Sequence, residues 1–321
     1  MRRLRNPGEA PAVGVIYNPR SHRNIRGYFD FSLCPNVLTA QPDSLAQLTT
    51  AMSEFAEKAI NLLVICGGDG TVRDVLTCGL EIFGDDWPAI AVLPRGKTNA
   101  LSVDLAIPRN WGLQDALAAL DHGKRVYRCP MKVTAVSEPG KYVAGFILGA
   151  GAFTKATHAG QRAHKLGAFG SIVVGVTGMW TLMQFMFATR GNAWRRGARM
   201  LIGLGNTDEP MGYSGKWDPS MRQLLFASTL ERFPAGMRPF GALKTGLKLV
   251  IVDQISRRAA LMIPIVLMSK LKFRLRQRGI HQLLTTQFSL SIDDEVILDG
   301  EAFPSDDYRI EEGPELAFIV P

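Results

Sequence analysis

The run Cys66-Gly67-Gly68-Asp69-Gly70-Thr71 constrains the fold of this chain more than any other feature. It follows the apolar stretch Leu62 to Ile65 and precedes Val72 to Leu76, which is the order strand, tight turn, helix. Glycines let the backbone turn sharply and let a ligand approach the main chain. The free N–H groups and the positive dipole end of the following helix attract phosphate. The run therefore predicts a nucleotide site.

Asp69 is the unusual residue of this run. A carboxylate in a phosphate cradle repels the ligand unless a metal ion or a reacting hydroxyl offsets its charge. Asp69 therefore favours chemistry as well as binding. The alternative is an ordinary Gly-Asp-Gly turn between a strand and a helix.

The first part of the chain alternates short apolar runs with helical stretches. We expect strands over residues 13–17, 37–39, 62–66 and 89–93, and helices over residues 44–58, 72–83, 99–106 and 111–121. This alternation is typical of a parallel sheet with helices on its faces. Ligands of such sheets bind beyond the carboxyl ends of the strands. We therefore expect one crevice to be lined by Asn18, Thr39, Gly67 to Thr71 and Gly96 to Asn99.

After residue 124 the pattern changes to extended segments. They cover residues 126–136, 142–149, 200–206 and 287–298, and apolar and basic helical stretches interrupt them. The chain has 321 residues, of which 46% are hydrophobic and 21% charged, so it is long enough for two packed domains. A second, strand-rich domain is the simplest interpretation.

Four segments, in this order, resemble those of a known family. They are Asn18-Pro19-Arg20-Ser21-His22, Gly67 to Thr71, Pro94 to Ala100, and Asp299-Gly300-Glu301. In order and spacing the chain resembles the diacylglycerol kinase catalytic family, which includes sphingosine, ceramide and bacterial lipid kinases. The resemblance implies an α/β nucleotide-binding domain over residues 1–124, with a parallel sheet and helices on both faces. It implies a β-sandwich-like lipid domain with inserted helices over residues 125–305, and leaves open whether residues 306–321 rejoin the first domain.

The resemblance also assigns roles to residues. ATP would be bound by Asn18, Pro19, Ser21, Thr39, Gly67, Gly68, Asp69, Gly70, Thr71, Gly96, Lys97, Thr98 and Asn99. Phosphoryl transfer to a hydroxyl needs a cation and a carboxylate that takes the proton. Glu301 is the implied base, Asp299 is close enough to help, and Asp69 is the implied partner of Mg²⁺ or substrate. A plain hairpin turn is the alternative for Asp299 to Glu301, and a reversal of the roles of Glu301 and Asp69 is left open.

The sequence departs from the family pattern at several positions. His22 replaces a glycine, Lys97 stands where threonine is usual, and Ala100 replaces an aspartate. A second-domain Asp-Gly-x-x-Asp, which resembles the magnesium-organising segment of bacterial relatives, has no match, because Trp217-Asp218-Pro219 is followed by Arg222-Gln223-Leu224. The way in which Mg²⁺ is held is therefore open.

Gly96-Lys97-Thr98 copies the end of a Walker A loop. The match fails at the front, where Ala91 lies inside an expected strand and Pro94 stiffens the loop. Lys97 is expected either to place a cation near nucleotide phosphates or to lie solvated at the surface. The five histidines show no metal or hydrolase spacing.

The net charge of +8 favours a polyanionic partner. Basic residues of the run Lys270 to Arg278 follow the apolar stretch Ala259 to Met268, a mixture that suits an anionic membrane surface. No pattern typical of nucleic-acid binding supports that partner. We therefore expect peripheral membrane association without nucleic acid; a solvated basic helix is the alternative, and a homodimer is left open.

Two further features bear on location. The cysteines Cys34, Cys66, Cys78 and Cys129 form no short pair, which fits a reducing cytoplasm, and no signal peptide is recognised. The stretch Leu166 to Thr189 carries no charge, but glycines and polar residues dilute it. We interpret it as one or two buried or interfacial helices rather than a membrane span. The expected location is the cytoplasm, at the inner face of the membrane.

The function predicted from these features is an ATP-dependent lipid kinase that phosphorylates the hydroxyl of diacylglycerol, or of a sphingolipid such as ceramide or a sphingoid base. An NAD kinase shares the glycine loop, but an Asn-Glu dinucleotide segment is not evident here. A catalytically silent, membrane-associated nucleotide sensor is the other alternative, favoured by Lys97, Ala100 and the missing second-domain aspartates.

Overall fold

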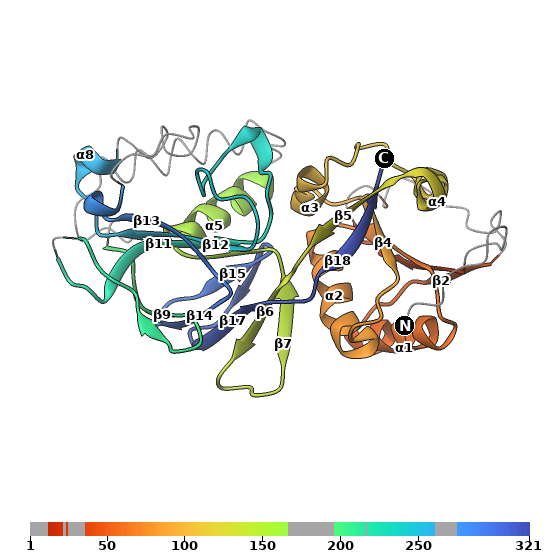
Figure 1. Cartoon of the computed structure of the whole chain (residues 1–321), viewed down its shortest axis with the longest axis horizontal. Coiled ribbons are helices and arrows are strands. Elements are labelled where there is room, and N and C mark those ends of the chain that lie inside the picture. Colours follow the sequence, from red (N-terminus) through yellow and green to blue (C-terminus); the bar gives the residue numbers. More distant parts are fainter. Residues whose placement is uncertain (1–11, 22–23, 25–35, 166–195, 216, 261–274) are drawn as a thin grey trace. The chain divides into compact units, whose positions relative to one another are not determined.

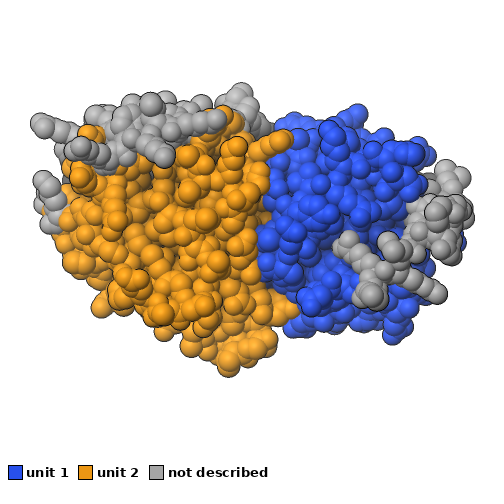
Figure 2. All heavy atoms as spheres, in the orientation of Figure 1, with its two compact units in different colours: residues 1–130, 143–145, 313–321 blue, residues 131–142, 146–312 orange. Residues whose placement is uncertain are grey.

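The chain is divided into two compact units in the computed structural model, which describes residues 12–21, 24, 36–165, 196–215, 217–260 and 275–321. The first unit contains residues 1–130, 143–145 and 313–321, and the second contains residues 131–142 and 146–312 (Figure 2). Residues 166–189, His22 and most of the apolar and basic stretch 259–278 lie outside the described residues. Among the described residues, no helix has the length and apolar character needed to cross a membrane.

The first unit is built on a six-stranded sheet in the order β2-β1-β3-β4-β18-β5. The strands are β1 (Val13–Tyr17), β2 (Val37–Ala40), β3 (Leu62–Gly67), β4 (Ala89–Pro94), β18 (Leu316–Val320) and β5 (Lys124–Arg128). All neighbours are parallel except β18 and β5. Every residue of β3 and β4 is buried, as expected for strands covered on both faces.

Helices lie on both faces of this sheet (Figure 1). They are α1 (Leu45–Glu57), α2 (Asp69–Phe83), α3 (Ala100–Asp104) and α4 (Leu113–His122). Ser44 begins α1, because its side chain accepts the N–H of Gln47. The predicted parallel sheet with helices on both faces is confirmed.

The last strand of the chain completes this sheet, since β18 lies between β4 and β5. The unit boundaries differ by a few residues from the predicted 124 and 306. Residues 124–128 stay with the first unit because β5 pairs with β18. Residues 307–312 stay with the second because they form β17 (Asp307–Glu312), which pairs there with β14 (Gln287–Ile292) and β6 (Met131–Ala135).

The second unit is built on antiparallel strands, in agreement with the prediction. Besides β6, β14 and β17 they include β7 (Tyr142–Gly145), whose last three residues belong to the first unit, β8 (Ile147–Gly151), β9 (Ala198–Leu204), β10 (Glu209–Pro210), β11 (Met221–Ser228), β12 (Leu247–Asp253), β13 (Ile280–Thr285), β15 (Val296–Leu298) and β16 (Glu301–Phe303). The pair β9 and β11 is joined only at Met221 and Arg222, where the sheet turns from the layer with β14 and β17 to the layer with β12 and β13 (Figure 1). The helical elements among the described residues of this unit are α5 (Ala152–Lys165), η2 (Pro234–Gly236), α8 (Arg257–Ala260) and η3 (Arg276–Arg278).

The position of β18 gives a stability prediction. Phe318 is fully buried at the centre of this strand. Phe318→Ala should lower the free energy of unfolding by about 3–5 kcal/mol, because it removes transfer free energy and leaves a cavity. Tyr127→Ala, on the neighbouring strand β5 with 49% of the residue exposed, is the control and should change stability little. Equal effects of the two variants in urea denaturation would contradict the placement of β18.

Candidate functional site

The predicted glycine loop is shorter than its sequence suggests. Gly67 ends β3, Gly68 alone forms the turn in an extended conformation, and α2 begins at Asp69. The expected helix start at residue 72 was therefore three residues late, and Asp69, Gly70 and Thr71 lie in the first turn of α2. The N-terminus of α2, with the N–H groups that have no partner inside the helix, therefore follows the carboxyl end of β3 after a single residue.

The turn after β3 lies against the loop after β4. A Cβ added to Gly96 would lie 2.6 Å from the Cα of Gly68, and one added to Gly68 would lie 2.9 Å from the Cα of Gly96. The N–H of Arg95 also donates to the carbonyl oxygen of Gly67 at 2.9 Å. Glycine is thus needed at both positions for packing, and the two loops predicted to share one crevice do lie side by side.

Asn99 turns its side chain back into its own loop. The residue adopts a left-handed conformation, with φ of 52°. Its Oδ1 accepts the N–H of Gly96, and its Nδ2 donates to the carbonyl oxygen of Gly96, both at 2.8 Å. Asn99 therefore shapes the loop of residues 96–99 from within.

The Asp69 carboxylate spans the two loops. Its Oδ1 accepts the N–H of Ala100 at 2.7 Å, at the start of α3. Burial raises the pKa of Asp69 above its usual value, while the backbone N–H groups of Ala100, Asn99 and Leu101 oppose that rise. One oxygen of the predicted metal partner is thus engaged by the protein itself.

The segment after β1 reaches the same site. Asn18 donates from Nδ2 to Thr71 Oγ1 at 2.8 Å, and its backbone N–H donates to the carbonyl oxygen of Cys66. Asn24, which sequence reasoning missed, is buried and donates to the carbonyl oxygen of Asn18 at 2.8 Å. No motif marks Asn24, so only its contacts reveal that it holds this segment. Ser21 is buried beside it and is not exposed to a ligand in this structure.

The remaining predicted nucleotide residues are open to solvent. Pro19, Thr39, Lys97 and Thr98 are exposed at the carboxyl ends of their strands or in the loops that follow. Gly70 has no atom within 4 Å of an added Cβ, so its glycine is not required for packing. Ala91 is buried in β4, which agrees with the interpretation that the Walker A match is accidental.

Asp299, Gly300 and Glu301 lie in the second unit and form a hairpin. Asp299 and Gly300 have φ of 46° and 88° between β15 and β16, and Leu298 pairs with Glu301. Two positive φ values in a two-residue loop are typical of a type I′ turn, for which Asp-Gly is a preferred sequence. The hairpin considered as an alternative is therefore present, and it places Glu301 exposed on the edge strand β16.

Asp299 has a clear positioning role in this hairpin. Its Oδ2 accepts the N–H of Phe146 at 3.0 Å and its Oδ1 the N–H of Ile147 at 2.9 Å. Both oxygens thus fix the turn to the start of β8. This arrangement holds the backbone next to Glu301 in place.

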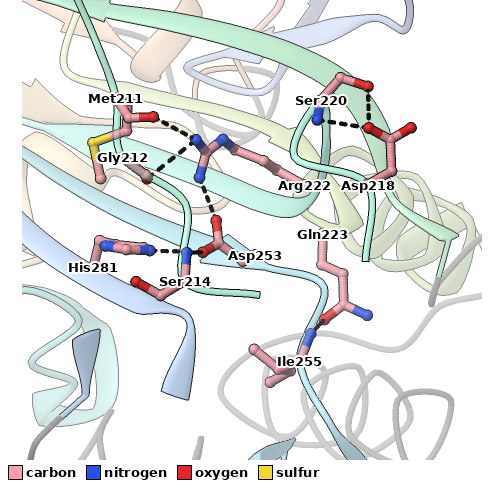
Figure 3. A network of polar contacts seen from close by, with 10 residues as sticks. All are labelled: Met211, Gly212, Ser214, Asp218, Ser220, Arg222, Gln223, Asp253, Ile255 and His281. Carbon is pink, nitrogen blue, oxygen red and sulfur yellow. Dashed lines mark hydrogen bonds and ion pairs between the residues drawn. The ribbon is translucent and has the colours of Figure 1, made fainter. Parts of the chain in front are cut away.

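The segment of the second unit where the Asp-Gly-x-x-Asp of the family has no match contains a buried cation, Arg222 (Figure 3). Arg222 pairs through Nη1 with Asp253 Oδ1, and donates from Nη2 to the carbonyl oxygens of Met211 and Gly212 at 3.0 and 3.3 Å. Asp253 also accepts the Ser214 N–H and contacts His281 Nε2, both at 2.8 Å. A guanidinium at this position does not fit a metal ligand set.

Other potential metal ligands give no alternative. Asp218 accepts the N–H and hydroxyl of Ser220 in its own turn. Across the described residues, no cluster of three or more His, Cys, Asp or Glu side chains could hold a metal ion. Asp69 alone fits Mg²⁺ only in the mode in which phosphates and water supply most ligands.

The Arg222–Asp253 pair should be necessary for the stability of the second unit. Asp253→Ala should lower the free energy of unfolding by about 3–5 kcal/mol, because it leaves a buried guanidinium without its carboxylate. The control is Arg20→Ala, which breaks an exposed pair with Asp43 and should have little effect. Chemical denaturation of both variants is the measurement, and a cost for Asp253→Ala no larger than for Arg20→Ala would refute the role.

Comparison with known proteins agrees with the resemblance drawn from the motifs. Residues 12–129 match the family model described as the diacylglycerol kinase catalytic domain. A probable lipid kinase YegS of Shigella flexneri is 28% identical over 162 residues, which cover 48% of this chain and 52% of that protein. A diacylglycerol kinase of Bacillus subtilis is 30% identical over 151 residues, which cover 45% of this chain and 47% of that protein. The chain thus spans about half the length of the curated relatives it matches.

Solved structures extend the similarity of fold to both units. A putative diacylglycerol kinase from Bacillus anthracis superposes with a TM-score of 0.61 at 18% sequence identity, and the match covers 97% of each chain. A second structure from that organism, titled as a diacylglycerol kinase, gives a TM-score of 0.58 at 17% identity. At this identity the similarity shows the fold alone.

Proposed function

We propose that the chain is an ATP-dependent lipid kinase, because residues 12–129 match the family model described as the diacylglycerol kinase catalytic domain. It transfers the γ-phosphoryl group to the hydroxyl of a membrane lipid. The acceptor is diacylglycerol or a sphingolipid such as ceramide or a sphingoid base.

The observation that carries the proposal is the close approach of Gly68 and Gly96 at the N-terminus of α2. First-turn N–H groups and the helix dipole attract phosphate there. Gly70 leaves space over that turn, and Lys97 adds a cation from the exposed part of the neighbouring loop. These features support the placement of the ATP phosphates over residues 67–71, with help from residues 96–99.

Gly70→Ala tests this placement without disturbing the fold. The residue is helical and an added Cβ meets no atom, so the variant should be as stable as the wild type or more so. A methyl group over the first turn should weaken ATP binding by about tenfold, or roughly 1.4 kcal/mol, because the phosphates can no longer approach the main chain.

The control is Gly112→Ala, at the N-terminus of α4, where an added Cβ makes only ordinary contact. It should leave ATP affinity, measured by isothermal titration, unchanged. An unaltered affinity in Gly70→Ala would place the phosphates elsewhere.

We further propose Glu301 as the general base. It is exposed on β16, and the hydrogen bonds of Asp299 fix the turn before it. A carboxylate in this role takes the proton from the lipid hydroxyl as the phosphoryl group is transferred. Mg²⁺ bound with ATP would supply positive charge to the phosphates, with the phosphates and water as most of its ligands.

Glu301→Gln keeps the size of the side chain and removes its charge. Turnover should fall by about 10²–10⁴, the usual contribution of a general base, while ATP affinity stays near that of the wild type. Glu138→Gln, another exposed carboxylate of the second unit, is the control and should retain full turnover. Near-normal turnover of Glu301→Gln would assign the base to another residue.

The lipid acceptor implies a membrane partner. We propose that the protein binds peripherally to an anionic surface, at the inner face of the cytoplasmic membrane, through the basic run that includes Arg276 and Arg278. The net charge of +8 supports this proposal, since each basic residue near an anionic surface contributes about 1 kcal/mol. Peripheral binding is compatible with a homodimer, and sedimentation measures the oligomeric state.

One assay separates the proposed function from its alternatives. The purified protein is incubated with labelled ATP and Mg²⁺ and with diacylglycerol, ceramide, a sphingoid base or NAD, each lipid in anionic and in neutral vesicles. A labelled lipid supports the kinase, and more product on anionic vesicles supports the membrane proposal. Label on NAD alone would identify an NAD kinase, and ATP binding without any product would identify a silent nucleotide sensor.

A further inference from the structure

We propose that Asp69 is a positioning residue that holds the loop of residues 96–99 against the β3–α2 turn, and that it is neither the base nor the principal metal ligand. The proposal rests on the proposed function, because it assigns a role within the ATP site. It starts from the way in which the two loops are joined.

The loop of residues 96–99 is tied to the β3–α2 turn at both of its ends. Before the loop, the N–H of Arg95 donates to the carbonyl oxygen of Gly67 at 2.9 Å. After the loop, the N–H of Ala100 donates to Asp69 Oδ1 at 2.7 Å. Between these two hydrogen bonds, Gly96 contacts Gly68 through the main chain. Asp69 therefore supplies the side-chain half of a two-point attachment.

The start of α3 explains why a distant carboxylate is needed there. An N-cap residue usually has an extended backbone and accepts an N–H of the first turn with its side chain. Asn99 occupies the N-cap position of α3 in a left-handed conformation, and its side chain is bonded to Gly96 instead. Asp69, 31 residues earlier in the chain, takes over the capping role.

The surroundings of the carboxylate agree with this role. Burial raises the pKa of Asp69, and the backbone N–H groups of Ala100, Asn99, Leu101 and Asp69 itself oppose that rise. The hydrogen bond from Ala100 thus joins a carboxylate at the start of α2 to the start of α3. A hydrogen bond between N–H and a charged carboxylate is stronger than one between neutral groups.

The other end of α3 is fixed as well. Asp104, its last residue, is buried and accepts from Arg128 Nε of β5 at 2.7 Å. With Asp69 of α2 at one end and Arg128 of β5 at the other, the short helix is fixed at both ends. The loop that precedes α3 thus presents Lys97 and Thr98 to solvent on a fixed support.

Two substitutions separate positioning from chemistry. Asp69→Asn retains an oxygen that accepts the Ala100 N–H, whereas Asp69→Ala removes it. For a positioning residue, Asp69→Ala should raise the KM for ATP by about tenfold or more, because a hydrogen bond to a charged group is lost and the loop is released. Asp69→Asn should stay within about threefold of the wild type in both kcat and KM, since the capping bond is preserved.

Amide hydrogen exchange provides a readout that needs no catalysis. Residues 96–101 should exchange faster in Asp69→Ala than in the wild type, and at nearly the wild-type rate in Asp69→Asn. Unchanged exchange of this segment in Asp69→Ala would overturn the proposal even if the protein bound no nucleotide.

Kinetics give the other decisive outcomes. A kcat lowered by about 10²–10⁴ in Asp69→Asn, at unchanged KM, would make Asp69 the base and overturn the proposal. A raised Mg²⁺ requirement in both variants would make it a metal ligand and would also overturn it. Failure of the ATP site itself is recognised separately, since Gly70→Ala would then leave ATP affinity unaltered.

Discussion

The main-chain contact between Gly68 and Gly96 is the constraint on which the candidate site depends. It exists because β3 and β4 are adjacent and parallel, so that their carboxyl ends, Gly67 and Pro94, are in register. Side chains at either glycine would force the two loops apart. Once the loops meet, the N-terminus of α2 and the exposed residues of the second loop belong to one site. The nucleotide chemistry proposed for this chain follows from sheet geometry more than from any single side chain.

The two units satisfy their buried charges in different ways. In the first unit, carboxylates are placed against backbone N–H groups or an arginine, as Asp69 and Asp104 show. In the second unit, the Asp253 carboxylate contacts the guanidinium of Arg222, the imidazole of His281 and the backbone N–H of Ser214. Removing one member of such a buried group lowers the free energy of unfolding strongly, because the remaining charge is buried without a partner or water. Arg222 thus stabilises the region in which the acidic motif of the family is missing.

Much of the first unit was predictable from the sequence, because its strands are continuous apolar runs with turn signals at their ends. The segment 13–17 was predicted with the bounds that β1 has, whereas the start of α2 was missed, since glycines and an aspartate read as a loop. The hydrogen bond between Asp69 and Ala100 joins residues that are 31 positions apart, and no local sequence pattern predicts it. The network around Asp253 was equally hidden, because its members come from three strands and a loop.

The order of β18 in the first sheet has a consequence for folding during synthesis. The strand emerges from the ribosome only after the whole second unit, yet it lies between β4 and β5. Until then β4 has an open edge, an arrangement that exposes unpaired backbone groups. The antiparallel pairs of the second unit can form earlier, because all of their strands lie within residues 131–312. The nascent chain is therefore expected to complete its second unit before its first, the reverse of the usual N-terminal-first order.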